Sequence, residues 1–469
     1  MAKSSVLTRR EILAATAATV LSSGSAWGQG RTSKPNIVYI MADDLGYADL
    51  SWYGRCEYKT SNIDSIALHG MKFLQAYANS AVCSATRTAL ITGRYQYRLR
   101  VGLEEPVRNP SPHGLPPEHP TFPSLLKRAG YGTTLIGKWH LGGLPDFGPL
   151  KSGYDHFWGF RWGALDYFTH KTGIASTDTE DLWDDDAKIH QVGYLTDLMG
   201  DRAVKVIGDY AKAGQPFLMS LHFNAPHWPW EGPGDDAESQ RIKALDDRDG
   251  GSMRTYAQMV MRMDMQVGRV LKALSDAKIA NNTIIVFTSD NGGERFADTW
   301  PFSGRKTELL EGGLRIPALV RWPGHIRAGS TTDQVGITMD WMPTFLAAAG
   351  TTPDPAFPLD GMNLLPQLTQ GIAPVPRRLY WRYHFNSQRA LREGDLKYLS
   401  IAGNEFLFNV ADDPLERANL KERQPDVFKR MVQAYEEWNA TMLPDRDDIR
   451  SGPAGYADEL ADHFGVPRK

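Results

Sequence analysis

The chain has 469 residues, of which 42% are hydrophobic, and its formal net charge is −3. A chain of this length can bury a large core, and its mildly acidic charge gives no support to nucleic-acid binding or binding to an anionic membrane. Only two cysteines, Cys56 and Cys83, are present, which excludes the disulfide framework of a small secreted protein. We expect Cys56 to be an ordinary small buried residue or to form a single bridge with Cys83.

Residues 1–28 are typical of an export signal. Basic residues Lys3, Arg9 and Arg10 precede a mildly apolar run rich in Ala and Thr, and small residues follow around Ala26. The run is too short to span a bilayer, and the alternative is a frayed amphipathic helix. The arginine pair in "TRREIL" resembles a twin-arginine signal. We therefore expect export to the periplasm and no integral membrane segment in the mature chain.

Strands and helices are predicted to alternate along most of the chain. Short apolar runs predict buried strands at 36–41, 132–136, 216–223, 283–288 and 316–322, and helical patterns lie at 123–130, 194–214 and 253–277. This alternation predicts an α/β fold with a large mixed, mostly parallel sheet flanked by helices. The apolar stripe of the last helix is predicted to pack in the core, and it consists of Met259, Met263, Val267 and Val270.

Two proline-containing stretches divide the chain. The first, at 105–123, is predicted to be a surface loop, and the second, at 371–378, precedes a segment of different character. Aromatic-rich strands and a final helix are predicted there, at 378–385, 396–401 and 425–442. We therefore predict a main domain over 34–370 and a smaller C-terminal α+β subdomain over 377–469.

Polar side chains follow four of the predicted strands. In chain order they are Asp43 and Asp44, then Lys138 and His140, then His227, then Asp290 and Asn291. Each group alone has an ordinary explanation, such as a helix cap, a surface histidine or a "DNGG" turn. Because open α/β sheets bind ligands at the carboxyl ends of their strands, the four groups together predict one shared crevice.

The chemistry of these residues predicts the kind of ligand. Asp43, Asp44, Asp290 and Asn291 offer only oxygen ligands, which suit a hard divalent cation such as calcium or magnesium. A second set is cationic or can become so, and it consists of Arg87, Lys138, His140, His227 and Lys306. Such groups bind a tetrahedral anion whose charge is partly neutralised by the metal. The sequence therefore predicts transfer or hydrolysis of a sulfate or phosphate ester.

Seven motifs occur along the chain in a characteristic order: "MADDLGYADLSWYG", "CSATRTALITGRY", "GKWHLG", "PHWPW", "SDNGG", "GRKTELLEGGLRIP" and "LFNVADDPLERANL". Their order and context resemble the type I sulfatase family of the alkaline phosphatase superfamily. The resemblance covers nearly the whole chain after the signal. It implies an alkaline phosphatase-like fold, a catalytic domain over 34–370 and sulfuric ester hydrolase activity of the arylsulfatase type.

The resemblance also implies a modified nucleophile. In this family the cysteine of a CxPxR-like motif is oxidised by a maturation enzyme to formylglycine, whose hydrate attacks sulfur. The matching residues are Cys83 and its partner Arg87, and the motif departs from the commonest pattern at Ala85, where proline usually stands. The departure leaves open which maturation system acts. A position at a helix start would add backbone N–H groups beside the anionic site.

The remaining roles follow from the same resemblance. One calcium ion, favoured over magnesium, would be held by Asp43, Asp44, Asp290, Asn291 and the modified Cys83. Asp290 would accept the proton of the attacking hydroxyl, and His140 would take the proton of the second hydroxyl when sulfate leaves. Binding the sulfate oxygens and assisting the departing alcohol would be the roles of Lys138, Lys306 and His227.

Two other functions are compatible with these residues. A phosphate or phosphonate ester hydrolase of the same superfamily would use a similar site, and a protein that only binds sulfated glycans would result if Cys83 were not converted. The substrate is expected to be a sulfated carbohydrate or other small sulfate ester. Residues proposed to line the outer pocket are Trp162, His170, Trp183, His384 and Arg389, which could instead pack a junction between subdomains.

Overall fold

The computed structural model describes residues 34–172, 179–241 and 250–452. The export signal expected over residues 1–28 lies outside these ranges. In the part of the chain that the structure describes, no helix combines the length and the hydrophobicity that crossing a membrane requires.

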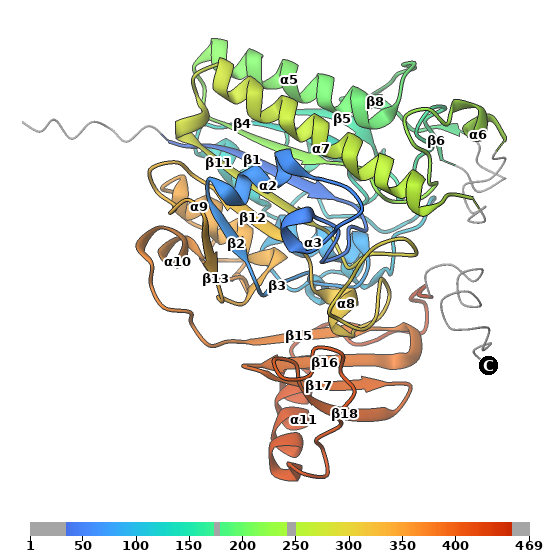
Figure 1. Cartoon of the computed structure of the whole chain (residues 1–469), viewed down its shortest axis with the longest axis vertical. Coiled ribbons are helices and arrows are strands. Elements are labelled where there is room, and N and C mark those ends of the chain that lie inside the picture. The colour runs from blue at the N-terminus through green and yellow to red at the C-terminus, as the bar shows by residue number, and fades with distance from the viewer. Residues whose placement is uncertain (1–33, 173–178, 242–249, 453–469) are drawn as a thin grey trace, which may run out of the picture. The chain divides into compact units, whose positions relative to one another are not determined.

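A ten-stranded sheet forms the centre of the fold (Figure 1). Its strands in spatial order are β13 (Ser330–Thr332), β2 (Met71–Phe73), β12 (Ala318–Arg321), β11 (Thr283–Ser289), β1 (Asn36–Ala42), β10 (Phe217–His222), β4 (Gly132–Lys138), β5 (His156–Phe160), β8 (Trp183–Asp184) and β9 (Ala187–Lys188). The central strands from β11 to β5 are parallel, whereas β12 and β8 run antiparallel to their central neighbours. The predicted mixed, mostly parallel sheet is confirmed.

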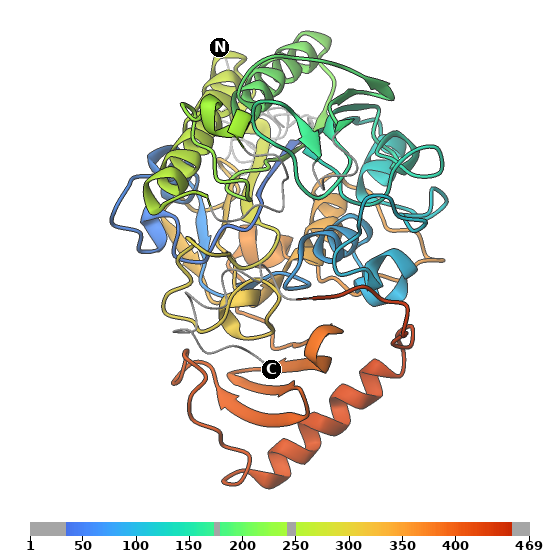
Figure 2. The same ribbon diagram turned by 90° about the vertical axis from the view of Figure 1, so that its right-hand side faces the viewer.

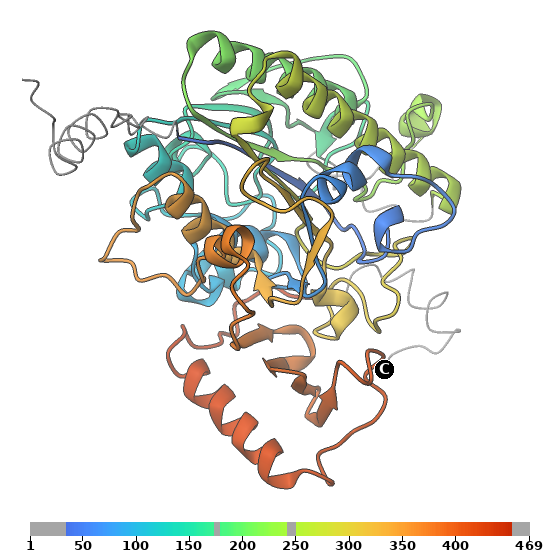
Figure 3. The same ribbon diagram turned by 60° about the vertical axis from the view of Figure 1, so that its left-hand side comes forward.

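Helices cover both faces of this sheet because successive side chains of each buried strand point to opposite faces. In β1, Val38 and Ile40 belong to one apolar cluster, and Ile37 and Tyr39 belong to the other. The first cluster includes α2 (Ser61–Leu68), α5 (Leu195–Ala213) and α7 (Met253–Asp276), and the second includes α3 (Cys83–Thr92), α4 (Phe122–Arg128), α9 (Trp341–Ala348) and α10 (Leu365–Gln370). Figure 3 shows the two helical layers on opposite sides of the strands. The predicted Met259, Met263, Val267 and Val270 stripe is fully buried, which confirms its place in the core.

Shorter elements connect these layers. Two small ladders are formed by β3 (Ala76–Tyr77) with β14 (Gly336–Ile337) and by β6 (Lys171–Thr172) with β7 (Thr179–Glu180). Two short α-helices are α6 (Asp236–Arg241) and α8 (Glu311–Leu314). Single 3₁₀ turns lie at Ser51–Tyr53, Gln96–Arg98, Arg100–Leu103, Leu150–Ser152, Ala280–Asn282, Thr338–Asp340 and Phe385–Ser387.

A four-stranded antiparallel sheet follows near the end of the chain (Figure 2). It consists of β15 (Arg378–Tyr383), β16 (Gln388–Glu393), β17 (Leu396–Ile401) and β18 (Asn404–Asn409), with α11 (Pro425–Asn439) packed on one face. The other face contacts the main domain, where the indole Nε1 of Trp381 donates to the carbonyl oxygen of Ala78 at 2.8 Å. We call β15 to β18 the C-terminal sheet. The domain boundary between residues 370 and 377 stays a prediction.

Two expectations from the sequence are wrong. Cys56 is exposed, and both cysteines are free, so Cys56 is neither buried nor bridged to Cys83. The stretch at 105–121 contains no helix or strand, but it is not confined to the surface, because Glu105, Val107 and Leu115 are buried. Composition predicted a loop correctly, yet it gave no indication that the loop packs into the interior.

Candidate active site

The structure brings the polar residues of the predicted crevice together at one edge of the large sheet. Four strands supply them: β1 leads into Asp43 and Asp44, β4 into Lys138 and His140, β10 into His227, and β11 into Asp290 and Asn291. Arg87 from α3 and Lys306 from the loop before α8 complete the set. All of these side chains are buried, with Lys306 at 7% exposed.

The acidic residues form one connected cluster. The backbone N–H of Asp44 donates to Oδ1 of Asp290 at 3.2 Å, and the amide nitrogen of Asn291 donates to Oδ1 of Asp44 at 2.7 Å. Burial raises the pKa of Asp43 well above its usual range, and the neighbouring Asp290 carboxylate adds to this rise. Concentrated negative charge of this kind requires cations beside it.

Two oxygens in this cluster have no hydrogen-bond partner, although buried polar atoms nearly always have one. They are Oδ1 of Asp43 and Oδ1 of Asn291. Ligand atoms of Asp43, Cys83 and Asp290 lie within 4.8 Å of one another. Unpartnered carboxylate and amide oxygens beside further carboxylates are the donors that a hard divalent cation prefers. The residues present therefore fit such an ion.

Three cationic side chains contact the acidic cluster. The Arg87 guanidinium donates to Oδ2 of Asp290 from Nε at 3.2 Å and from Nη2 at 2.9 Å. Nζ of Lys138 lies 2.5 Å from Oδ2 of Asp43, and Nζ of Lys306 donates to Oδ2 of Asp44 at 2.6 Å. The cations thus surround the carboxylates, and an anion entering the cluster would meet positive charge from three elements.

Cys83 is the first residue of α3, which begins directly after the extended Val82. The turn before the helix is fixed because the backbone N–H of Ser80 donates to the hydroxyl of Thr86 at 2.9 Å, and that hydroxyl donates back to the carbonyl of Ser80. Burial raises the pKa of the Cys83 thiol to about 11. Because Cys83 begins the helix and its sulfur lies within 4.8 Å of ligand atoms of Asp43 and Asp290, the positive end of the helix dipole is close to the acidic cluster.

His140 is oriented toward Cys83 in a defined tautomer. Its Nε2 lies 2.8 Å from the carbonyl oxygen of Val107, which can only accept, so Nε2 carries the hydrogen. Its Nδ1 then presents a lone pair to Sγ of Cys83 at 3.3 Å. Burial lowers the pKa of His140 well below its usual range, with Lys138 contributing. The ring needs the space left by Gly163, where a Cβ would lie 2.8 Å from Cε1 of His140.

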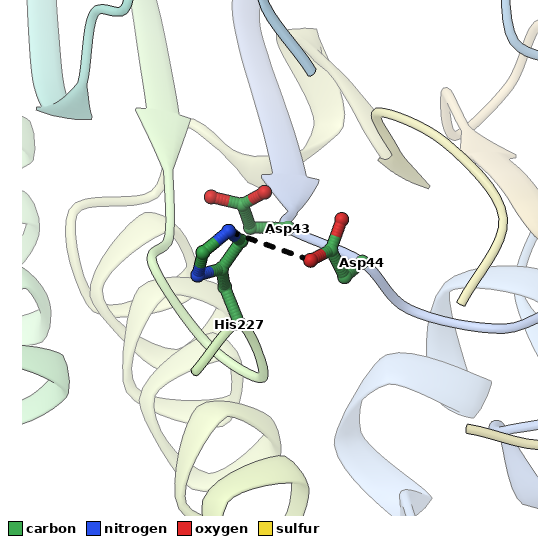
Figure 4. Close-up of side chains that lie close together, drawn as sticks. All are labelled: Asp43, Asp44 and His227. Atoms are coloured by element: carbon green, nitrogen blue, oxygen red, sulfur yellow. Dashed lines mark ion pairs between the residues drawn. The ribbon is translucent and has the colours of Figure 1, made fainter. Parts of the chain in front are cut away.

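His227 lies beside Asp43 and Asp44 of the acidic cluster (Figure 4). Its Nδ1 is 2.6 Å from the carbonyl oxygen of Trp228, so Nδ1 carries a hydrogen, and its Nε2 is 3.5 Å from Oδ2 of Asp44. The hydroxyl of Tyr167 donates to the backbone carbonyl of His227 at 2.9 Å. The two histidines therefore approach the cluster from different elements, which suits them to different proton transfers.

Sequence reasoning missed three residues beside the site. Val107 acts through its backbone carbonyl, and Gly163 acts by leaving space, so neither side chain carries a recognisable signal. His222 ends β10, and its Nδ1 lies 3.2 Å from the carbonyl of Lys138 and 3.4 Å from Nη1 of Arg87. Burial lowers its pKa to about 3. Its place at a strand end is the same signal that identified Lys138.

The structure corrects part of the proposed outer pocket. Arg389 pairs with Glu436 of α11 at 2.8 Å, on the face of the C-terminal sheet turned away from the main domain, so its assignment to the pocket is wrong. Of the other four residues, Trp162 is partly buried, and Nε2 of His170 lies 3.1 Å from the carbonyl oxygen of Gly193. The indole N–H of Trp183 donates to the carboxylate of Asp181, and His384 pairs with Asp445.

Comparison with known proteins identifies the class. The chain matches the family model "Sulfatase" over residues 35–351 and therefore belongs to the sulfatase family. It is 34% identical to human N-acetylgalactosamine-6-sulfatase over 73% of this chain and 67% of that one, and 29% identical to mouse arylsulfatase J over 91% and 80%. The crystal structure titled "Ps i-CgsB in complex with k-i-k-neocarrahexaose" superposes with a TM-score of 0.80, 30% identity and coverage of 92% of this chain and 98% of that one. The protein is a sulfuric ester hydrolase.

Proposed function

We propose that the enzyme hydrolyses a sulfate ester of a sulfated carbohydrate, with formylglycine derived from Cys83 as the nucleophile. The observation that carries this proposal is the position of Cys83. It begins α3, it is buried beside the acidic cluster, and Nδ1 of His140 is 3.3 Å from its sulfur. The hydrate of formylglycine supplies two hydroxyl groups, one for attack on sulfur and one for the release of sulfate.

A calcium ion is the proposed metal, in preference to magnesium. It would be held by Asp43, Asp44, Asp290, Asn291 and the modified residue 83, and when bound it would polarise the sulfate group. Support comes from the unpartnered oxygens of Asp43 and Asn291. Asp290 holds Arg87 through two hydrogen bonds, and we propose that it accepts a proton from residue 83, because ligand atoms of the two residues lie within 4.8 Å of each other.

The cationic residues are proposed to bind the sulfate group and assist the leaving alcohol. Lys138 and Lys306 each contact a carboxylate of the cluster, which places their ammonium groups beside the proposed metal position. Nδ1 of His227 donates to the carbonyl of Trp228, so Nε2, which lies 3.5 Å from Oδ2 of Asp44, is the ring nitrogen proposed to give a proton to the alcohol. Nδ1 of His140 is available to take a proton from residue 83.

The substrate class rests on the similar proteins. One relative is named N-acetylgalactosamine-6-sulfatase, and one solved relative was crystallised in complex with k-i-k-neocarrahexaose. A screen of sulfated mono- and oligosaccharides tests the class, and relative rates on sulfate and phosphate esters of one leaving group test the choice of sulfate over phosphate. Equal or faster phosphate hydrolysis would contradict the proposal.

Export and maturation complete the proposal. Arg9 and Arg10 support a twin-arginine-like route to the periplasm. Because this route accepts folded proteins, a formylglycine-generating enzyme would act on Cys83 before export. Replacing both arginines by lysine should retain the protein inside the cell. Unchanged export of that variant would contradict the route.

His227→Ala is expected to slow release of the alcohol, and most strongly for poor leaving groups. The reason is that a poor leaving group needs the proton from Nε2, whereas a stabilised phenolate departs without it. We expect a loss of about 100-fold or more in kcat/KM for alkyl esters and a much smaller loss for activated aryl sulfates. Equal losses across a series of leaving groups would exclude the acid role.

His140→Ala is expected to leave the first half of the reaction intact and slow the second. Without Nδ1, the variant lacks the group that is proposed to take the proton of the second hydroxyl of residue 83 when sulfate is released. Rapid-mixing kinetics should therefore show a burst of alcohol equal to the enzyme concentration, followed by slow turnover. Slow turnover without a burst would show that His140 acts in the first half instead.

A further inference from the structure

A buried glutamine of the C-terminal sheet holds the backbone that follows Lys306. Gln388, the first residue of β16, is 2% exposed. Its Oε1 accepts from the backbone N–H of Leu309 at 2.9 Å, and its Nε2 donates to the backbone carbonyl of Thr307 at 2.9 Å. Both ends of one side-chain amide are therefore bonded to the same short segment, 307–309.

This segment has a conformation that needs support. Thr307 has a φ of 71°, which is unfavourable for a β-branched residue and persists only where surrounding contacts fix it. Contacts that fix it include the two bonds from Gln388 and a bond from the backbone N–H of Thr307 to the carbonyl of Ala81 at 2.8 Å. Ala81 lies in the turn that leads to Cys83. The segment is thus held between the nucleophile's turn and the C-terminal sheet.

Lys306 is the residue whose position this arrangement determines. Its backbone N–H donates to the carbonyl of Gly293 at 3.0 Å on one side, and the Gln388-bound segment begins directly on the other. Its Nζ reaches Asp44 at 2.6 Å and Glu294 at 3.3 Å. A shift of the backbone at Thr307 would move the ammonium group relative to Asp44.

We propose that Gln388 is a positioning residue for Lys306, so that the C-terminal sheet fixes one of the groups that bind the sulfate. The inference rests on the proposed role of Lys306. Gln388 does not reach the acidic cluster itself and acts through the backbone of residues 307–309. Charge stabilisation requires the donor to keep its hydrogen-bonding position beside the developing charge, so a small displacement of Lys306 lowers the rate.

Gln388→Met tests this, because methionine has a similar length but can form neither the two bonds to residues 307–309 nor the bond that Nε2 donates to the carbonyl of Phe385 at 3.2 Å. We expect kcat/KM for a sulfate ester to fall on the order of 10- to 100-fold, and the inhibition constant for inorganic sulfate to rise. Gln334→Met is the matched control. Gln334 is 1% exposed, and its amide also bonds only to backbone, at Val335 and Val375. The Gln334→Met variant should lose about as much thermal stability as Gln388→Met and keep normal kinetics.

A double-mutant cycle separates positioning from a general structural effect. In the Lys306→Ala background, Gln388→Met should have no further effect on kcat/KM, because the group that it positions is gone. If the Gln388→Met factor persists in full in that background, or if folded Gln388→Met has the normal rate and the normal inhibition by sulfate, the inference is wrong.

Failure of the underlying proposal gives a different result. If Lys306→Ala has an unchanged kcat/KM, the proposed role of Lys306 in sulfate binding is wrong, whatever the effect of Gln388→Met. If Gln388→Met does not fold, Gln388→Glu provides the same cycle, since the carboxylate still accepts from Leu309 while the bonds that Nε2 donates to Thr307 and Phe385 are lost. Gln388→Glu should also lower kcat/KM in the otherwise unchanged enzyme and have no further effect in the Lys306→Ala background. A loss that persists in that background would refute the inference.

Discussion

Asp290→Ala is expected to lower kcat for sulfate ester hydrolysis by about 1000-fold or more and to reduce the calcium bound per chain. The carboxylate of Asp290 accepts from Arg87 and from the backbone of Asp44, and one of its oxygens lies within 4.8 Å of ligand atoms of Asp43 and Cys83. One substitution therefore removes a proposed metal ligand and releases the arginine beside the nucleophile. Metal content by mass spectrometry and steady-state kinetics measure the two losses separately.

A second variant guards against simple unfolding. Arg87 is 2% exposed, so removing Asp290 leaves this buried charge only the longer ion pair with Asp43, at 3.7 Å, and lowers stability. Asp290→Asn keeps one oxygen that can accept from Arg87, and Asp264→Asn makes the same change in a buried carboxylate of α7 that bonds to Asn62 and Ile63. Asp290→Asn should lose metal and activity, and Asp264→Asn should keep both. A chelator should also abolish activity, and full activity of protein shown to be free of metal would refute the metal site.

The sequence predicted those parts of the fold that depend on local pattern. The strands at β1, β4, β10 and β11 were predicted to within two residues, because each is buried on both faces and reads as a continuous apolar run. Strand β16 was not predicted. Its residues facing the main domain include Gln388 and Arg392, which bond to polar groups there, so the strand lacks apolar alternation. The mistaken placement of Arg389 follows from that omission, since the direction of its side chain depends on the register of β16.

The sequence predicted the candidate site residues that act through their side chains. It did not predict the residues that act through a backbone carbonyl or by leaving space for a neighbour. Asp43, Asp44, Asp290 and Asn291 were identified because strand ends of a parallel sheet converge, a rule that needs no coordinates. The orientation of His140 depends on the backbone carbonyl of Val107 and on the space left by Gly163, which has no side chain. Every residue type has a backbone carbonyl, so the identity of Val107 does not indicate its role. The contact between Gln388 and Thr307 joins positions 81 residues apart, and no local pattern indicates it.

Cys83→Ala is expected to abolish sulfate ester hydrolysis while the protein folds. The residue begins α3, and its side chain is small, so truncation costs about 1 kcal/mol of packing and leaves the acidic cluster in place. The variant should therefore bind calcium and unfold near the normal temperature. Cys56→Ala is the matched control, because Cys56 is the other free cysteine and is exposed, and it should keep full activity.

The chemical state of residue 83 distinguishes the formylglycine mechanism from a thiol mechanism. Trypsin cleavage after Lys72 and Arg87 gives one peptide that contains this residue. Mass spectrometry of active enzyme should show it as an aldehyde or its hydrate, lighter than the encoded cysteine in the aldehyde form, and activity should rise in proportion to the converted fraction. Efficient hydrolysis by protein in which Cys83 is wholly unmodified would show that another nucleophile acts, because a thiol whose pKa is about 11 is almost entirely protonated at neutral pH.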